Sequence, residues 1–188
     1  MRIILASQSE FRKKALEILG LKYEVKPSNI DEKSIRDSNP VELARKLAEA
    51  KALEVAKTEE DSIIIASDLF VTFNSKIYEK PISEEEAFEM LKSFSGNILD
   101  ILTGVAVYNT KTGKLLSAVS ASKLRFRNLT DFEIKDYIKR YPVLKCAAAF
   151  ESDGASRFGE TISGDYPAHY GIPLKQLILF LRENHIEV

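Results

Sequence analysis

Hydrophobic residues follow two periods along this chain, one typical of buried strands and one typical of amphipathic helices. Short apolar runs bounded by turn residues predict strands. These runs are residues 2–6, 62–73, a short stretch near Ile77, 99–109 and 115–127. The last two flank Thr110-Lys111-Thr112-Gly113 and predict a hairpin of long strands, whereas Asn74-Ser75 predicts a turn into the short strand.

The helical segments have recognisable starts. Asn39 before Pro40 predicts an N-cap and a first helical residue, and the spacing to a glutamate predicts capping boxes at Ser83 and Thr130. The predicted helices run from an N-cap at Ser9 to Gly20, from Pro40 to about Ala56, from Ser83–Glu86 through Phe94, from Thr130–Glu133 through Lys139, and from Pro173 onward. Strands and helices alternate without a linker or repeat, which predicts an α/β fold with a mixed sheet.

Composition excludes several classes of protein. With 188 residues, 45% hydrophobic and 29% charged, the chain is an ordinary globular protein of one domain or two closely packed lobes. Its apolar runs are too short to cross a bilayer, and the N-terminus has no cleavable signal pattern, so we expect a cytoplasmic location and no membrane partner. A net charge of −1 provides no field for a nucleic acid polymer, although a small anion could bind to a few local cations.

Cysteine and histidine are scarce. The single Cys146 excludes an internal disulfide framework, and His169 and His185 are too few for a structural zinc site. Any catalytic metal should therefore be a hard ion held by carboxylates, meaning Mg²⁺ or Mn²⁺.

Two charged residues interrupt apolar patterns. Asp68 stands inside the predicted strand 62–73, where a carboxylate is costly unless it is paired, bound to metal, or turned to solvent by a bulge. Lys51 falls on the apolar face of the predicted helix 40–56, where its ammonium either snorkels to water or meets an anion. Each residue is a candidate for function, and each also has a purely structural interpretation.

Other charged positions add to this inventory. The loop Ser7–Lys14 joins a strand end to a helix start, where free backbone N–H groups favour a phosphate. It has no glycines and is neither a Walker A loop nor a dinucleotide fingerprint, and a capped surface helix would fit it equally well. Glu32 and Lys80, in polar loops, add a carboxylate and a cation. Together with Arg12, Lys51 and Asp68 they form a set suited to metal-assisted phosphoryl chemistry.

Several motifs, in order, resemble the Maf family of nucleotide pyrophosphatases. The family opens on Leu-Ala-Ser-x-Ser-Pro-Arg-Arg, and here the segment is Leu5-Ala6-Ser7-Gln8-Ser9-Glu10-Phe11-Arg12. The other matching segments are Asp31-Glu32, Leu47-Ala48 with Lys51-Ala52, Ser67-Asp68, Lys80-Pro81, Ser95-Gly96, Thr103-Gly104-Val105, Gly164-Asp165-Tyr166 and Gly171-Ile172-Pro173-Leu174. Ordered matches over nearly the whole chain are far more specific than any single motif.

The resemblance implies one Maf-like domain over residues 1–188. Its fold would be a mixed, twisted α/β sheet flanked by helices, with two lobes around a central cleft, as in inosine triphosphatase. The implied activity is hydrolysis of a small-molecule nucleoside triphosphate between its α- and β-phosphates, with a divalent metal, and the implied assembly is a homodimer. The implied roles are general base or metal-linked carboxylate for Asp68, metal assistance for Glu32, and phosphate binding for Ser7, Arg12, Lys51 and Lys80.

Base choice in the family depends on positions that here hold Phe11, Leu69 and Asp153. The thymidine- and uridine-nucleotide branch has arginine, threonine and glutamine in the corresponding motifs. An aromatic at the first position and an acid at the last resemble the 7-methyl-GTP branch instead. The chemistry is coherent, because a methylated guanine is cationic and is attracted by an aromatic face and a carboxylate. Phe11 could equally be the first core residue of its helix.

Three hypotheses follow from the sequence. The sequence favours a pyrophosphatase for a modified nucleotide such as 7-methyl-GTP, and the alternative is a dTTP/UTP pyrophosphatase with the same chemistry. The third is a nucleotide-binding regulator without catalysis, linked to cell division, for which the departures at Glu10 and Leu69 are the only support.

Overall fold

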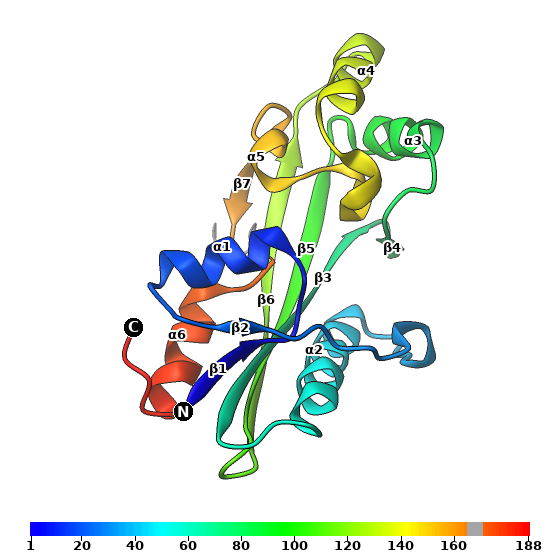
Figure 1. The fold of residues 1–188 in the computed structure, drawn as a ribbon. Coiled ribbons are helices and arrows are strands. Elements are labelled where there is room, and N and C mark those ends of the chain that lie inside the picture. The colour runs from blue at the N-terminus through cyan, green and yellow to red at the C-terminus, as the bar shows by residue number, and fades with distance from the viewer. Residues whose placement is uncertain (165–170) are drawn as a thin grey trace. The chain divides into compact units, whose positions relative to one another are not determined.

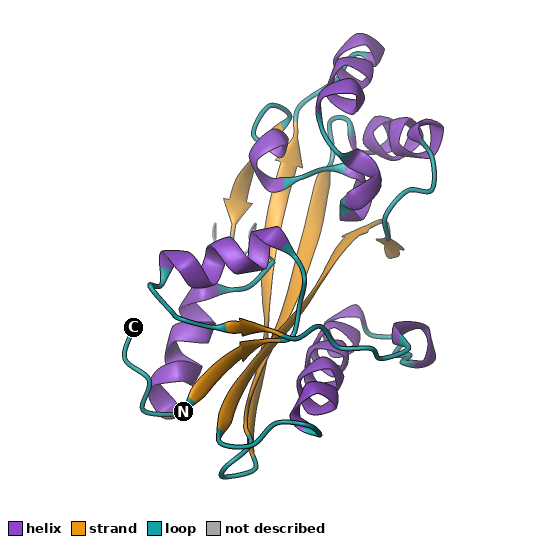
Figure 2. Cartoon of the chain, in the orientation of Figure 1, coloured by secondary structure: helices purple, strands orange, loops and turns teal. Residues whose placement is uncertain are grey.

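The computed structural model describes residues 1–164 and 171–188, and for Ser152 and Asp153 the backbone alone. The strands are β1 (Arg2–Leu5), β2 (Glu24–Val25), β3 (Ser62–Phe73), β4 (Lys76–Tyr78), β5 (Ile98–Asn109), β6 (Lys114–Phe126) and β7 (Gly159–Ser163). The α-helices are α1 (Glu10–Ile18), α2 (Pro40–Ala56), α3 (Glu84–Phe94), α4 (Asp131–Arg140), α5 (Ser152–Ala155) and α6 (Leu174–Glu183). Short 3₁₀ helices are η1 (Glu32–Ser34), η2 (Val143–Lys145) and η3 (Ala147–Ala149). Figures 1 and 2 show these elements.

The strands of the described residues form one seven-stranded mixed sheet. Its order is β2-β1-β3-β5-β6-β7, and β4 pairs with the end of β3. β1 pairs in parallel with β2 and β3, whereas β3–β4 and β6–β7 are antiparallel. Residues 110–113 connect β5 to its neighbour β6, a connection short enough only for an antiparallel hairpin. The predicted mixed α/β sheet is therefore confirmed.

The chain forms two compact units. Unit 1 comprises Met1–Leu69, Thr103–Ser120 and Tyr170–Val188, and unit 2 comprises Phe70–Leu102 and Ala121–His169. β3, β5 and β6 contribute residues to both units, because the unit boundaries fall within these strands.

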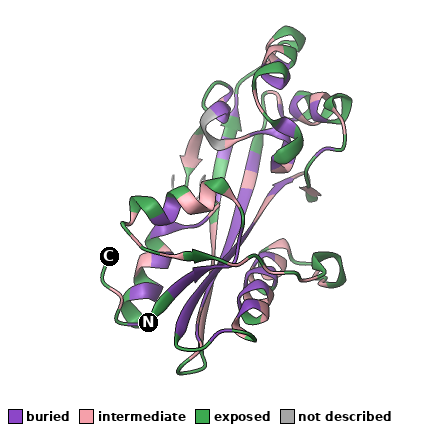
Figure 3. Ribbon diagram, viewed as in Figure 1, coloured by how far each residue is buried: buried purple, intermediate pink, exposed green. Residues whose placement is uncertain are grey.

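Unit 1 has helices on both faces of its strands, and alternate strand residues contact different helices. This follows from the period of two in a β-strand. One core packs α1 and α6 against Ile3, Leu5, Ile63, Ile65, Val105 and Val107. The other packs α2 against Ile4, Ala6, Ile64, Ala66 and Ala106. Figure 3 shows β1 and β3 buried between these layers.

Unit 2 has an aromatic core. Phe94 at the end of α3 stacks on Phe126 of β6, with ring centroids 5.9 Å apart. Phe150 meets both rings edge-on, at 6.4 and 5.5 Å, the geometry that ring quadrupoles favour. On α4, Tyr137 is fully buried and lies 4.3 Å from the ring of Phe158. These contacts join α3, α4 and the ends of the long strands.

Helix starts agree with the sequence in most cases. The Asn39 side chain accepts from Val41 N at 2.9 Å, and Thr130 forms a complete capping box. At α3 only half of the predicted box forms, because the Glu86 carboxylate accepts from Ile82 N instead. Ser9 is the N-cap residue of α1, as predicted, although its side chain makes no capping bond. Pro173 precedes α6 as its N-cap.

Some elements were not predicted. β2, β7, α5 and the 3₁₀ helices are two to five residues long, too short to show a hydrophobic period. Glu32, expected in a polar loop, begins η1. Among the described helices, none has the length and apolar character that spanning a bilayer would need.

Gly104 on β5 allows α2 to lie close to the sheet. A Cβ at this position would be 2.2 Å from the carbonyl oxygen of Ala44, which is backbone and cannot rotate away. We expect Gly104→Ala to push α2 outward and lower the free energy of unfolding by ~1–3 kcal/mol, the cost of overpacking. Urea denaturation measures this directly. An unchanged midpoint would show that α2 does not need this close approach.

Candidate active site

Asp68 and Lys51 form a buried ion pair in unit 1. The residues are each 6% exposed, and Lys51 Nζ donates to Asp68 Oδ1. Asp68 follows Ile64 and Ala66 in the period of β3 and therefore faces α2, where Lys51 lies in the predicted buried stripe. The interpretations in which Asp68 turns to solvent and Lys51 snorkels are wrong.

Glu32 is a second carboxylate on the same ammonium. Its Oε1 lies 3.0 Å from Lys51 Nζ, and its side chain is 54% exposed. η1 positions it, because the Asp31 side chain caps this turn by accepting from Lys33 N at 3.1 Å. One buried and one solvent-exposed carboxylate thus share a single cation.

Arg12 of α1 is held by two oxygen acceptors. Its Nε donates to Gly171 O at 3.2 Å and its Nη1 to Ser7 Oγ at 3.0 Å. Burial lowers the pKa of the Arg12 guanidinium, and the negative charges of Asp68 and Glu32 oppose that shift. Arginine still stays protonated. Ser67, the residue before Asp68, contacts the same Gly171 carbonyl, so Arg12 lies close to the group that Lys51 forms with Glu32 and Asp68.

Two hydroxyls support this group. Ser7 is buried at the end of β1, and its Oγ also accepts from Ser9 N at 3.2 Å, so it fixes the loop that leads into α1. Ser67 is fully buried beside Asp68, and its Oγ lies 2.6 Å from the carbonyl oxygens of Gly104 and Gly171. No role of its own was predicted for Ser67 from the sequence. The available clue was a polar residue next to Asp68 in an otherwise apolar strand.

Lys80 belongs to unit 2, where it follows β4 and is exposed. It lies near Cys146, whose thiol pKa is raised to about 11 chiefly by burial and further by Glu151, while the positive charge of Lys80 opposes the rise. Glu79, the residue before Lys80, is bound to η3, because its carbonyl oxygen accepts from Ala148 N at 3.0 Å.

Of the three residues predicted to determine base specificity, the structure describes the side chains of two. Phe11 on α1 is half-buried, and Lys14 Nζ lies 5.9 Å from its ring centroid. Leu69, also half-buried, directly follows Asp68 on β3. The side chain of Asp153 lies outside the described residues, although its backbone begins α5 with Ser152. His169 and the motif residues Asp165-Tyr166 also fall outside.

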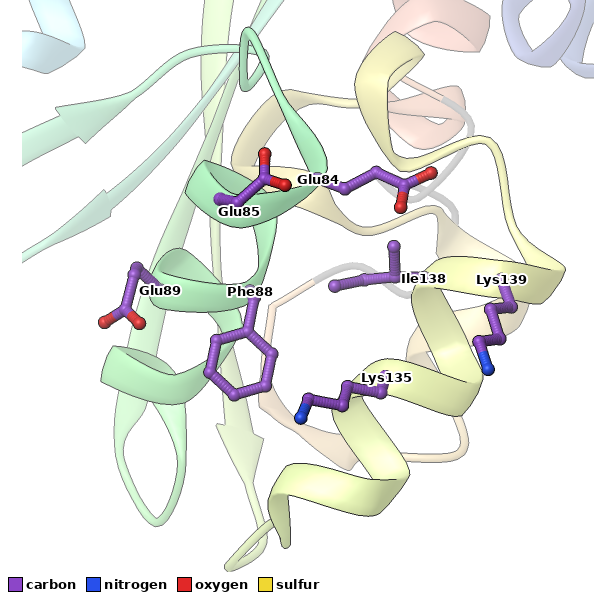
Figure 4. A pocket seen from close by; sticks show the side chains of 7 residues that line it. All are labelled: Glu84, Glu85, Phe88, Glu89, Lys135, Ile138 and Lys139. Carbon is purple, nitrogen blue, oxygen red and sulfur yellow. The ribbon is translucent and has the colours of Figure 1, made fainter.

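A surface pocket of about 380 Å³ in unit 2 contains none of these residues. It lies between α3 and α4 and is lined by Glu84, Glu85, Phe88, Glu89, Lys135, Ile138 and Lys139 (Figure 4). Its charges occur in both signs, and Lys135 Nζ lies 5.7 Å from the Phe88 ring.

Metal-ligand clustering is limited in the described residues. No group of three or more histidine, cysteine, aspartate or glutamate side chains gathers there to hold an ion. The two carboxylates on Lys51 are hard oxygen donors, which suit Mg²⁺ or Mn²⁺ more than a transition metal that prefers nitrogen or sulfur.

Comparison with known proteins places the chain. A family model described as Maf-like protein matches residues 2–184. The chain belongs to the Maf family. A curated member, a dTTP/UTP pyrophosphatase of Clostridium tetani, is 40% identical over 187 residues, covering 97% of each chain.

Solved structures resemble this Maf protein in fold. A HAM1 protein from Coxiella burnetii aligns over 97% of this chain and 99% of its own, with a TM-score of 0.54 at 18% identity. A nucleoside-triphosphatase / dITP/XTP pyrophosphatase from Mycobacterium abscessus aligns over 69% of this chain and 76% of its own, at 15% identity. Its TM-score of 0.41 is too low for any inference.

The buried ion pair of this Maf protein should be essential to its stability. Lys51→Met removes the ammonium and leaves the Asp68 carboxylate buried, so we expect a loss of ~3 kcal/mol in the free energy of unfolding. Lys57→Met is the matched control, because Lys57 pairs with Glu54 at the end of the same helix with its side chain 69% exposed. Such a surface pair contributes little. Equal urea midpoints for the two variants would contradict the expectation.

Proposed function

We propose that this chain hydrolyses nucleoside triphosphates between the α- and β-phosphates, releasing a monophosphate and pyrophosphate. The observation that carries the proposal is the convergence of Arg12 and Lys51 with Glu32 and Asp68 in unit 1. Cations can neutralise a polyphosphate, and a buried carboxylate beside them can serve as a base. Maf family membership and the pyrophosphatase name of the 40% identical relative support the same chemistry.

The phosphate chain would be held by cations and by the loop after β1. Arg12 is held beside this loop by Ser7 and Gly171. The first N–H groups of α1, a helix of nine residues, favour an anion at the same end. Lys51 contributes a second positive charge.

A divalent cation fits the two carboxylates. Glu32 and Asp68 supply oxygen ligands around one point, and Mg²⁺ commonly takes only one or two carboxylates, completing its shell with water and substrate phosphates. When bound, the ion would polarise phosphate oxygens and lower the pKa of water. Lys51 would then release at least one carboxylate, and its ammonium would become available to a phosphate.

Asp68 would act as the general base. A water molecule attacks the α-phosphorus, its proton passes to the Asp68 carboxylate, and the bond from the α-phosphorus to the bridging oxygen breaks. The electron pair of that bond leaves with pyrophosphate, whose added negative charge Arg12 and Lys51 offset. Because Asp68 is buried, its carboxylate is shielded from bulk solvent and is held by its contact with Lys51.

Asp68→Asn should remove turnover while leaving nucleotide binding largely intact. We expect kcat to fall ~100-fold or more, the usual contribution of a general base. The control is Asp61→Asn, because Asp61 is an exposed loop residue of the same unit with φ 46°, which asparagine tolerates. The measurement is pyrophosphate release with magnesium, and binding is followed by calorimetry. Turnover by the Asp68 variant close to that of the Asp61 control would rule out the proposed base.

For the base of the nucleotide we propose a pyrimidine, with dTTP and UTP as the first substrates. The relative of that name is similar along nearly the whole chain. Lys14 also lies over the Phe11 ring, so a cationic base stacked there would meet an existing positive charge. The second candidate is 7-methyl-GTP, favoured by the half-buried aromatic at position 11 and by an acid at position 153.

A panel of triphosphates separates these candidates. We expect kcat/KM for UTP and dTTP to exceed that for 7-methyl-GTP by about tenfold, the scale on which one favourable pocket contact discriminates. Phe11→Ala should change the pyrimidine values little, because it removes no hydrogen bond to the base. Preferred turnover of 7-methyl-GTP, lost selectively in Phe11→Ala, would establish the second candidate. Tight nucleotide binding without turnover of any member would indicate the non-catalytic regulator.

A further inference from the structure

We propose that Ser67 is a positioning residue for the phosphate site, acting through the Gly171 carbonyl on Arg12. This rests on the proposed function, since it assigns Arg12 to the phosphates. Ser67 itself would touch neither substrate nor metal. Its hydroxyl instead joins three separate segments of unit 1, namely β3, β5 and the loop that precedes α6.

The hydroxyl of Ser67 serves two acceptors with one proton. Its Oγ lies 2.6 Å from both Gly104 O and Gly171 O, and a hydroxyl can donate to only one of them at a time. Gly171 O also accepts from Arg12 Nε at 3.2 Å. The two donors therefore share one carbonyl, whose two lone pairs can take both.

This sharing lets Arg12 turn toward a phosphate at low cost. When Arg12 Nε leaves Gly171 O, the Ser67 hydroxyl can turn its proton from Gly104 O to Gly171 O without moving any heavy atom. Without the Ser67 hydroxyl, Gly171 O would lose the hydrogen bond from Arg12 Nε when Arg12 turns, and nothing would replace it from Ser67. A carbonyl left without a donor is unfavourable. Ser67 thus supports both the resting orientation of Arg12 and its release.

Gly171 is shaped for this contact. Its φ is +71°, a conformation that favours glycine, and an added Cβ would lie 3.4 Å from Arg12 Nε and 3.6 Å from Arg12 Cγ. The arginine side chain therefore packs directly along the Gly171 backbone. A displacement of this carbonyl would be transmitted to the guanidinium.

Ser67 and Asp68 act from opposite faces of β3. Ser67 follows Ile63 and Ile65 in the strand period and faces the side of α1 and α6, whereas Asp68 faces α2. Loss of the Ser67 hydroxyl should therefore change Arg12 and leave the contact of Asp68 with Lys51 in place. This separation predicts an effect on phosphate binding that exceeds the effect on the chemical step.

The test compares Ser67→Ala with Ser62→Ala. Ser62 is an equally buried serine on the same strand, and its hydroxyl also donates to a carbonyl, Glu60 O at 2.8 Å. The probe is inorganic tripolyphosphate with magnesium, measured by calorimetry, because it carries the phosphate chain without a base. We expect about tenfold weaker binding in Ser67→Ala and an equal rise in KM for UTP, on the scale of one buried carbonyl left without a donor. kcat should change by less than about threefold, and Ser62→Ala should change neither constant.

A double-mutant cycle shows whether Ser67 acts through Arg12. In an Arg12→Ala background the further change Ser67→Ala should have no effect on tripolyphosphate binding. Additive effects of the two changes would overturn the role of Ser67 but not the proposed phosphate site. The same conclusion would follow if Ser67→Ala bound tripolyphosphate like Ser62→Ala while Arg12→Ala bound it weakly. Tripolyphosphate binding unaffected by Arg12→Ala would instead overturn the proposed phosphate site. Ser67→Cys keeps a weak donor and similar volume, so it should give intermediate affinity, and it replaces Ser67→Ala if that variant does not fold.

Discussion

The contact between Lys51 and Asp68 is the constraint on which the rest of the site depends. A carboxylate inside an apolar strand is tolerated because an ammonium is buried with it, and the ammonium is tolerated because α2 presents it there. The pair therefore fixes the rotation of α2 about its axis and its distance from β3. Gly104 permits that distance, since any side chain there would meet the backbone of Ala44. Stability and the proposed chemistry thus depend on the same two residues.

The charge balance around this pair would allow the proposed site to accept a polyanion. Glu32 adds a second negative charge from the exposed side, and Arg12 adds a second positive charge from α1. Two cations and two carboxylates leave no large net charge in the protein alone. A metal and a triphosphate could therefore enter together by exchanging ionic partners, without leaving an isolated buried charge at any stage.

Much of this arrangement could be predicted from the sequence, for a physical reason. Asp68 and Lys51 are recognisable because each interrupts an apolar pattern that α2 and β3 otherwise follow closely. Ser67 could not be distinguished in the same way, since a small hydroxyl is common in strands and its importance depends on two carbonyls distant in the chain. The family resemblance named Arg12, but only the fold shows that Gly171, 159 residues later, holds it. Elements as short as β2 and η1 carry too few residues for any period to appear.

The alternation of β3 has a further consequence for how the protein reaches its native state. If β3 paired with β1 one residue out of step, Asp68 would point into the apolar layer of α1 and α6, and Ser67 would face Lys51. Lys51 would then lose its buried partner and keep only the exposed Glu32, which is more unfavourable than the misplacement of a few isoleucines. The residues that would serve catalysis therefore also discriminate against misfolded strand alignments, and a chain stripped of them would lose fidelity of folding along with its chemistry.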